Sequence, residues 1–436
     1  MDTIVAAATP AGGGIAILRI SGENALSILQ KVFFTRQKII SHKLIYGTLL
    51  DAQGAAADRC MAVFMAAPKT YTREDVAELH VHGGEAVLHT ALLSCVAHGA
   101  RLAQAGEFTK RAFLNGRVDL TEAEAVMGMV QATSQMAARA SFRALEGEML
   151  REIEQMYAQI EYLLAQISAA VDFPEEDLEA ETAIECAETI HTLLNDCTQI
   201  IERSHKTQVL RTGVHTVFTG IPNAGKSSLF NALLGFERAI VTPVAGTTRD
   251  AVGESVQLGG VAFYLTDTAG IRDTEDFVEG IGVSRARKAI QEADIVVNVI
   301  DGSADLGQQP LYSQDKPCIN IINKYDLYED IRWRDCDFLR VSASTKEGLQ
   351  QLQQQLLDVL PSETQAPVLA NTRQIDCMQR AQNALQFALQ SAQEFLPSDC
   401  IAVDLRDALL ALAELTGKMV DESVIENIFA NFCIGK

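Results

Sequence analysis

The feature that most constrains this chain is the segment Gly220-Ile221-Pro222-Asn223-Ala224-Gly225-Lys226-Ser227, which has the form G-x-x-x-x-G-K-S. It follows an apolar run that is typical of a strand, 214–219, and precedes a stretch typical of a helix, 228–234. In that context the glycines let backbone N–H groups surround phosphates, and the helix N-terminus adds partial positive charge. The alternative is a strand-to-helix turn in which Gly-Lys-Ser occurs by chance. The phosphate-binding interpretation assigns Lys226 to the outer phosphates and Ser227 to Mg²⁺.

Three further segments follow in the order expected of a GTP site. Asp267-Thr268-Ala269-Gly270 ends the next predicted strand, where an aspartate can hold Mg²⁺ through water and a glycine amide can contact the γ-phosphate. Asn323-Lys324-Tyr325-Asp326 resembles the N-K-x-D element of the GTPase superfamily, whose carboxylate accepts two hydrogen bonds from guanine that adenine cannot supply. Ser342-Ala343-Ser344 resembles the loop that supports the base, and Thr248 has the place of a switch threonine. We expect GTP as the ligand.

Two positions indicate which kind of GTPase this is. Ile271 stands where many signalling GTPases carry a glutamine that orients water, so another group must do this. The amide oxygen of Asn223 could ligate K⁺ beside the phosphates, with backbone carbonyls of 246–250 around the ion. The K⁺ would supply the charge that an arginine finger supplies elsewhere. The alternative for Asn223 is a turn residue that caps the loop.

Composition and periodicity predict a multidomain chain of 436 residues. Residues 1–118 mix glycine with short apolar runs and predict an α+β domain, with strands at 15–20, 44–50, 61–66 and 76–81 and a helix at 86–97. Residues 210–362 alternate buried strands, at 214–219, 261–266, 295–300 and 318–322, with helical stretches, which predicts an α/β domain with a parallel sheet. Residues 119–209 and 363–436 are helical, so we expect one α-helical bundle domain interrupted by the α/β domain.

The helical part carries a long apolar stripe. Its members recur every three or four positions and predict one helix that ends before Pro174. They are Phe142, Leu145, Met149, Ile153, Met156, Ile160, Leu163 and Ile167. A second helix is expected at about 182–206, and a further stripe contains Leu405, Leu409, Leu412 and Leu415.

The net charge of −21 argues against a whole surface made for nucleic acid. The charge is uneven, however, because residues 1–118 hold 12 basic and 9 acidic residues, a net of +3, whereas 119–209 have a net of −13. Contact with nucleic acid would therefore come from the N-terminal domain or, as the better expectation, from a basic partner. Nine scattered cysteines without a C-x-x-C pair indicate neither zinc nor a disulfide framework, and their odd number fits a reducing cytoplasm. We expect no signal peptide and no membrane span.

Several segments together resemble the MnmE (TrmE) family of tRNA-modification GTPases, within the TrmE-Era-EngA-like superfamily. They are Thr3–Ala6, Ile17–Gly22, Phe113-Leu114-Asn115-Gly116 and Phe432-Cys433-Ile434-Gly435-Lys436. The resemblance covers essentially the whole chain. It implies a homodimer that works in a heterotetramer with the flavoprotein MnmG. It also implies installation of an aminomethyl or carboxymethylaminomethyl group at C5 of the wobble uridine of certain tRNAs.

The resemblance further implies that the N-terminal domain dimerises and binds a 5-formyltetrahydrofolate-like one-carbon donor. The matching positions are Arg19, Glu78, Arg117 and Lys436. The three cations suit the glutamate carboxylates of a folate, and Glu78 suits the pterin donors. The residue at 117 is often Lys in the family, and Arg keeps the charge but changes the geometry of its donors. For Arg19 and Arg117 a solvated surface position is the alternative.

For the nucleotide, the resemblance implies a GTPase domain that K⁺ activates and that dimerises across the nucleotide. K⁺ would lie among Asn223, Thr242, Val244 and Thr247, Mg²⁺ would be held by Ser227 and Thr248, and Glu279 would orient the attacking water through another water. A solvated charge is the alternative for Glu279. The expected nucleotide contacts are Asn223, Ala224, Gly225, Lys226, Ser227, Ser228, Thr242, Pro243, Val244, Ala245, Gly246, Thr247, Thr248, Asp267, Thr268, Ala269, Gly270, Asn323, Lys324, Asp326, Ser342, Ala343 and Ser344.

Weaker signals remain open. His80 and His82 could bind a metal, although a structural role is favoured because no third ligand is close in sequence. Cys433 could be a nucleophile beside the one-carbon site or a bystander. The segments 301–316 and 326–342 are short, which leaves the helix count of the α/β domain open. The alternative function is a switch or assembly GTPase, for example in ribosome maturation, without tRNA chemistry.

Overall fold

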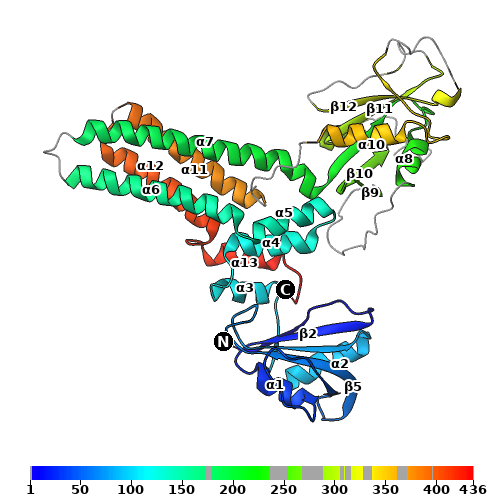
Figure 1. The fold of residues 1–436 in the computed structure, drawn as a ribbon, viewed down its shortest axis with the longest axis vertical. Coiled ribbons are helices and arrows are strands. Elements are labelled where there is room, and N and C mark those ends of the chain that lie inside the picture. Colours follow the sequence, from blue (N-terminus) through cyan, green and yellow to red (C-terminus); the bar gives the residue numbers. More distant parts are fainter. Residues whose placement is uncertain are drawn as a thin grey trace, which may run out of the picture. The chain divides into compact units, whose positions relative to one another are not determined.

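The computed structural model describes residues 2–172, 178–235, 254–267, 288–304, 309, 316–327, 336–360, 371–394 and 396–435. They fall into two compact units. The first contains residues 1–127, 150–193 and 376–436, and the second contains residues 128–149 and 194–375. The architecture is that of a multidomain protein with an α+β N-terminal part, a helical bundle and an α/β part (Figure 1). No helix in these ranges is both long and apolar enough to cross a membrane.

The N-terminal part is built on a seven-stranded sheet with the order β3-β4-β5-β6-β2-β1-β7. Its neighbouring strands are antiparallel except β1 and β7, which are parallel. The strands are β1 (Ile4–Ala7), β2 (Ile15–Ser21), β3 (Phe33–Phe34), β4 (Ile45–Leu50), β5 (Ala56–Met65), β6 (Val76–His82) and β7 (Arg101–Leu102). The strands expected near 15–20, 44–50, 61–66 and 76–81 are confirmed, and the sequence patterns missed β1, β3 and β7.

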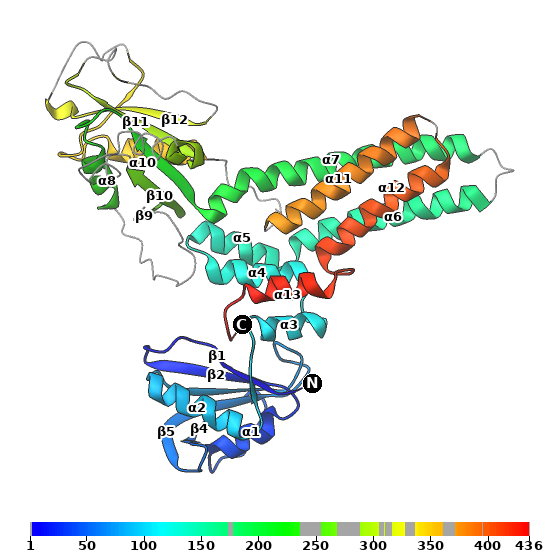
Figure 2. The same ribbon diagram turned by 180° about the vertical axis from the view of Figure 1, so that it is seen from behind.

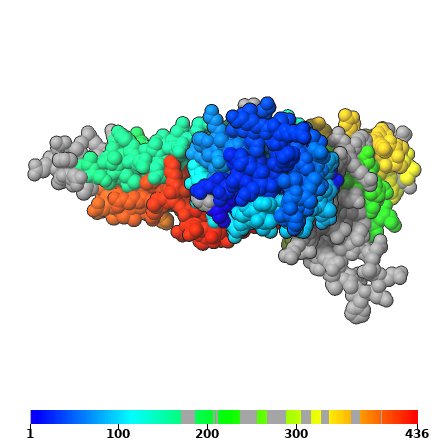
Figure 3. Space-filling model, turned by 90° about the horizontal axis from the view of Figure 1, so that it is seen from below, coloured from blue at the N-terminus to red at the C-terminus, as the bar shows by residue number. Residues whose placement is uncertain are grey.

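Helices cover both faces of this sheet. Apolar residues of α1 (Ala25–Val32) and α2 (Glu85–Ala97) form one core with alternate residues of the strands, such as Leu18 and Leu79. On the other face, Phe108 of α3 (Glu107–Leu114) packs against Ile4 and Ala6 of β1. The atoms of this N-terminal part form the continuous blue surface in Figure 3.

Long amphipathic helices form the bundle, and α6, α7, α11 and α12 run side by side in Figures 1 and 2. The helices outside the α/β part are α4 (Leu120–Gln131), α5 (Gln135–Leu145), α6 (Glu148–Asp172), α7 (Leu178–Thr212), α11 (Thr372–Gln393), α12 (Ser398–Thr416) and α13 (Glu422–Ala430). Residues 149, 153, 156, 160, 163 and 167 of α6 are all buried, as the stripe predicts.

The prediction of one helix through Phe142 and Ile167 is wrong. The chain forms two helices here, because Gly147 adopts a φ of +70° between α5 and α6. That left-handed conformation ends a helix and is open to glycine at little cost. Phe142 consequently belongs to α5 and is 51% exposed instead of continuing the buried stripe.

The α/β part has a six-stranded sheet with the order β13-β12-β11-β8-β10-β9, parallel except for β9. The strands are β8 (Val214–Thr219), β9 (Glu254–Leu258), β10 (Val261–Asp267), β11 (Ile295–Asp301), β12 (Cys318–Asn323) and β13 (Leu339–Arg340). Every residue of β11 is buried, which agrees with a strand covered on both faces. Helices α8 (Lys226–Leu234) and α10 (Leu349–Asp358) pack on one face, and Ile290 and Ala293 pack on the other.

Candidate functional site

The phosphate-binding loop connects β8 to α8, and its backbone requires glycine at two positions. Gly220 has φ +145°, and a Cβ there would lie 2.2 Å from the carbonyl oxygen of Val299. Gly225 has φ +86°, and a Cβ there would lie 2.2 Å from Nδ2 of Asn323. Asn223 takes φ +64° between them, a conformation that Asn tolerates better than most residues. The loop is therefore a cradle of close backbone approaches, as phosphate binding needs.

The lysine of the motif points into this loop. Lys226 is 5% exposed, and its Nζ donates hydrogen bonds to the carbonyl oxygens of Gly220 at 3.0 Å and Ile221 at 2.9 Å. Lys226 is also the first residue of α8, so the helix N-terminus and the ammonium lie together. Asn223, Ser227 and Ser228 are exposed at the same loop. The loop thus combines positive charge with accessible oxygen ligands.

Asn323 joins the phosphate-binding loop to the predicted base-recognition loop. Its Nδ2 donates to the carbonyl oxygen of Ala224 at 2.8 Å, and its Oδ1 accepts from the backbone N–H of Ala343 at 3.2 Å. The residue is 1% exposed. One buried side-chain amide therefore fixes the spacing between the two loops, which the sequence motif could not show.

Lys324 is positioned by an aspartate that sequence reasoning missed. Its Nζ lies 2.8 Å from Oδ2 of Asp301, the last residue of β11. Burial would raise the pKa of Asp301, but hydrogen bonds from Lys324 and Ser303 outweigh it and lower that pKa. The carboxylate therefore stays charged and holds the lysine. Its position at the carboxyl end of a predicted parallel strand, where ligands bind in such sheets, could have identified Asp301 from the sequence.

The carboxylate of Asp326, which is predicted to bind guanine, is held by serines of the segment 342–344. Oγ of Ser344 donates to Oδ2 of Asp326 at 3.0 Å, and Ser344 in turn contacts Ser342 at 3.0 Å. The hydrogen bond from Ser342 is the main cause that lowers the pKa of Asp326. An ionised carboxylate is what recognition of guanine donors requires.

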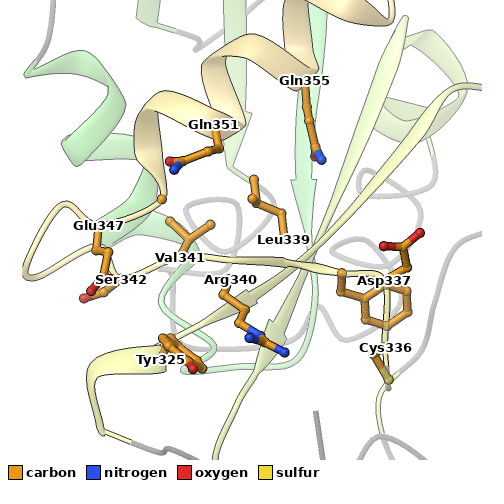
Figure 4. A pocket seen from close by; sticks show the side chains of 12 residues that line it. Tyr325, Cys336, Asp337, Leu339, Arg340, Val341, Ser342, Glu347, Gln351 and Gln355 are labelled. Atoms are coloured by element: carbon orange, nitrogen blue, oxygen red, sulfur yellow. The ribbon is translucent and has the colours of Figure 1, made fainter. Parts of the chain in front are cut away.

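A cavity of about 620 Å³ lies beside these loops, at the edge strand β13 (Figure 4). Tyr325 and Ser342 line it together with Arg340, whose guanidinium lies 5.4 Å from the ring centroid of Tyr325. Residues 220–228 do not line this cavity, so it is separate from the phosphate-binding loop.

Part of the predicted site lies outside the described residues. This holds for Thr242, Pro243, Val244, Ala245, Gly246, Thr247, Thr248, Thr268, Ala269, Gly270, Glu279 and Lys436. Asp267 is described as the last residue of β10, which runs parallel to β8. The segments whose helix content was left open, 305–308, 310–315 and 328–335, are also outside.

A second cluster of predicted residues occurs in the N-terminal part. Arg19 of β2 and Glu78 of β6 are opposite each other in the sheet, and Arg19 Nε donates to Glu78 Oε1 at 2.9 Å. The Arg19 guanidinium lies 5.8 Å from the ring centroid of Phe108. Burial would raise the pKa of Glu78, but hydrogen bonds from His80 and Arg19 lower it. The pair is therefore ionic and has an aromatic residue beside it.

Tyr71 belongs to this cluster and was missed from the sequence. Its hydroxyl forms a 2.9 Å hydrogen bond with Oγ1 of Thr109 in α3, and its ring packs with Phe108. Burial raises the pKa of Tyr71, while the charges of Arg19 and Arg117 act in the opposite direction. Both arginines therefore act on one phenol, and Arg117 itself is exposed. No sequence pattern links Tyr71 to these residues.

The segment 433–435 reaches the same sheet. Ile434 forms an antiparallel bridge with Ala105, and Cys433 accepts a hydrogen bond from the N–H of Gly106. Gly435 has φ +95°, and a Cβ there would lie 2.0 Å from the carbonyl oxygen of Ala7. Ala7 pairs with Leu18, the neighbour of Arg19, so this segment ends beside the second cluster. Cys433 is exposed.

The two histidines on β6 have separate acceptors. His80 Nε2 lies 3.3 Å from Glu78 Oε2, and His82 Nδ1 lies 2.7 Å from Asp58 Oδ1. Within the described ranges, no group of three His, Cys, Asp or Glu side chains is placed to hold a metal ion. His80 therefore contacts the carboxylate of the Arg19–Glu78 pair.

A glycine cradle with an inserted lysine, a buried N-K-x-D asparagine and a parallel sheet define a P-loop GTPase, here combined with an N-terminal sheet domain and a helical bundle. Residues 3–117 match the model of the GTP-binding protein TrmE N-terminus, and residues 120–433 match that of the MnmE helical domain. The chain belongs to the MnmE family of tRNA modification GTPases.

Similar proteins span the whole chain. A protein of Syntrophotalea carbinolica is 40% identical over 100% of this chain and 99% of its own, and one of Acetivibrio thermocellus is 37% identical over the same shares. A protein of a Synechococcus species is 42% identical over 100% of this chain and 98% of its own. Each carries the name tRNA modification GTPase MnmE. The predicted family is confirmed.

Proposed function

We propose that this GTPase acts in the cytoplasm as a homodimer, in a heterotetramer with the flavoprotein MnmG. The complex installs an aminomethyl or carboxymethylaminomethyl group at C5 of the wobble uridine of certain tRNAs. The proposal keeps the three predicted domains, 1–118, 119–209 with 363–436, and 210–362. The observation that carries it is the presence, in one chain, of a phosphate cradle around Lys226 and a separate cationic cluster around Arg19. A GTPase that acted only as a switch would need the phosphate cradle but not the cluster around Arg19.

At the nucleotide, we assign Lys226 to the outer phosphates and Asp326 to guanine. Asn323 keeps these two contacts in register through its bonds to Ala224 and Ala343. Asn223, exposed and held at φ +64° one residue before Ala224, is the proposed K⁺ ligand, with Thr242, Val244 and Thr247. Ser227 and Thr248 would hold Mg²⁺, and Glu279 would orient water.

The cation assignment is tested by GTP turnover in matched KCl and NaCl. We expect K⁺ to accelerate turnover and Na⁺ not to, because charge beside the phosphates stabilises the transition state. Asn223→Ala should lose this response, whereas Asn195→Ala, a substitution in α7, should keep it. Equal rates in both salts for the unaltered protein would refute the assignment.

At the second cluster, we assign Arg19, Arg117 and Lys436 to the carboxylates of a 5-formyltetrahydrofolate-like donor and Glu78 to its pterin. Glu78 is ionised in its pair with Arg19 and so offers an acceptor to the pterin donors, and the exposed Arg117 offers a cation to the carboxylates. The segment 433–435, which packs against Ala7, leads directly to position 436. The folate would supply the one-carbon unit, and these side chains would bind and orient it.

The tRNA role is tested by mass spectrometry of tRNA nucleosides from cells that lack the gene. We expect wobble uridines without the C5 substituent, and restoration by the unaltered gene but not by Lys226→Ala. Unchanged wobble uridines would instead favour the switch or assembly GTPase without tRNA chemistry.

A further inference from the structure

The N-terminal part carries an uninterrupted basic segment in an acidic chain. The chain has a net charge of −21, yet no aspartate or glutamate occurs between Asn24 and Leu50. Four cationic side chains in this segment are exposed, and we call them the basic cluster. They are Lys31, Arg36, Lys38 and Lys43.

These cations differ from the other arginines of the same part. Arg19 pairs with Glu78, Arg101 pairs with Asp2 and Glu107, and Arg111 pairs with Asp2, Glu74 and Glu107. None of the four members of the basic cluster forms an ion pair with a described residue. Their charge is therefore available to an external anion, whereas each of the paired arginines has at least one carboxylate of the chain beside it.

Lys31 lies in α1, and the loop that carries Arg36, Lys38 and Lys43 is anchored to the sheet. The N–H of His42 donates to the carbonyl oxygen of Phe64 at 2.7 Å, and the N–H of Ala66 donates to Oγ of Ser41 at 2.9 Å. Nε2 of His42 lies 2.9 Å from the carbonyl oxygen of Lys69. Because these contacts fix the backbone between Lys38 and Lys43, little further ordering is needed when a ligand binds.

Two exposed aromatic side chains lie on the strands at the two ends of the loop that carries Arg36, Lys38 and Lys43, on the face opposite α1. Phe34 and Tyr46 are 58% and 53% exposed. Phe34 pairs with Thr48, two residues from Tyr46 on β4, so both rings leave the same face of the sheet. Oγ1 of Thr35 donates to the carbonyl oxygen of Tyr46 at 3.0 Å, which ties the start of the loop to this strand.

We propose that the basic cluster, with Phe34 and Tyr46, is a tRNA-binding surface of this chain. Lysine and arginine would contact phosphates, and the rings would stack on unpaired bases. Aromatic residues on a sheet face suit stacking, whereas binding to a membrane surface generally uses an amphipathic helix. The proposal rests on the proposed function in tRNA modification and assigns this chain its own tRNA contact.

The test is tRNA binding by the full chain, measured by fluorescence anisotropy as KCl is raised. The variant replaces Lys31, Arg36, Lys38 and Lys43 by Gln, and the control replaces four exposed cations of other elements, Arg139, Arg151, Lys288 and Arg406, by Gln. Each phosphate contact contributes about 0.7–0.9 to the slope of log K against log [KCl]. We expect the variant to bind at least about 10-fold more weakly and its slope to fall by about 3. The control should bind like the unaltered chain.

Equal tRNA affinity and slope for the variant and the control would overturn the proposal. So would binding of the cluster to phosphatidylserine vesicles, lost in the variant, without a change in tRNA binding. Phe34→Ala with Tyr46→Ala should weaken binding without changing the slope, because stacking releases no counterions. K⁺-stimulated GTP turnover and folate binding are measured on the same variant and should persist, so failure of this proposal is separable from failure of the proposed function.

Discussion

Single atoms set the geometry of the GTP site. Gly225 and Asn323 are nearly a hundred positions apart, yet the missing side chain of the first leaves room for the amide of the second. Asn323 in turn holds the backbone of Ala343. The sequence motifs identify these residues. The hydrogen bonds of Asn323 show that the position of the phosphate-binding loop depends on that of the segment 342–344.

We predict that Gly225→Ala abolishes measurable GTP binding and destabilises the α/β part by about 2 kcal/mol or more. The new Cβ would meet Asn323 Nδ2 at 2.2 Å, and φ is +86°. Gly235→Ala is the matched control, because Gly235 ends α8 at φ −73° with its nearest contact at 3.4 Å. Urea unfolding and nucleotide titration measure both effects. Similar losses in the two variants would contradict the steric explanation.

Tyr71→Phe tests the second cluster. The ring that packs with Phe108 is kept, and only the hydroxyl bonded to Thr109 is removed. We expect 5-formyltetrahydrofolate to bind about 3- to 10-fold more weakly, since one such hydrogen bond contributes about 0.5–1.5 kcal/mol. Calorimetric titration gives the affinity, and Tyr162→Phe, at a residue 64% exposed, is the control. Unchanged affinity would place Tyr71 outside the site.

Among the helices and strands, sequence patterns predicted those with a regular apolar period. They missed those that form only by pairing with a strand distant in sequence. The long stripe of α6 and the buried strand β11 follow from local pattern. Two-residue strands such as β3 and β7 exist only because a neighbouring strand pairs with them. The break at Gly147 depends on one backbone angle that a stripe of apolar residues cannot reveal.

The same distinction applies to the sites. Local motifs predict Lys226, Asn323 and Asp326 as site residues, and the structure joins their loops through Asn323. Asp301 and Tyr71 were missed because their partners, Lys324 and Thr109, are 23 and 38 positions away and share no motif with them. Such residues become visible only when the sheet order is known.

Helix α5 is fixed to the turn between β9 and β10. The N–H of Met136 donates to the carbonyl oxygen of Gly260 at 3.2 Å, and Gln257 donates to the carbonyl oxygen of Thr133. The side chain of Met136 packs against the core of the α/β part. These contacts join α5 to the two strands that flank this turn, one of which ends at Asp267.

We predict that Met136→Ala lowers the free energy of unfolding of the α/β part by about 1–2 kcal/mol, less than for a fully buried methionine. The reason is the loss of apolar contact at the turn. Met419→Ala, at a residue 61% exposed, should change it by less than about 0.5 kcal/mol. Urea denaturation of both variants measures these free energies. Equal effects would show that the contact of Met136 does not stabilise the α/β part.

Over the whole molecule, some charged side chains are paired within the fold and others are exposed and unpaired among the described residues. In the N-terminal part, carboxylates hold Arg19, Arg101 and Arg111 in place. The hydrogen bond from Arg101 is the main cause that lowers the pKa of Asp2 to about 2, and the pKa of Glu78 and of Glu107 is also lowered. These carboxylates are more acidic in the folded chain than in the unfolded one.

The free energy of unfolding should therefore decrease when the pH falls into the acid range. A lowered pKa in the folded state contributes stability above the unfolded value, about 4, and this contribution is lost as pH falls through the folded value. We expect the first calorimetric unfolding transition to stay constant from about pH 8 to 5 and to move to lower temperature below about pH 4. Glu78→Gln should reduce this dependence, and Glu85→Gln, at an exposed residue, should not. An identical acid response in both variants would contradict the prediction.

The packing of residues 433–435 against Ala7 and Ala105 has a consequence for synthesis. During translation, the first sheet can fold as soon as its strands leave the ribosome, but its contact with Gly435 must wait until more than 300 further residues have been made. A product truncated before residue 433 would thus contain the phosphate-binding loop but lack the packing of residues 433–435 on the N-terminal sheet.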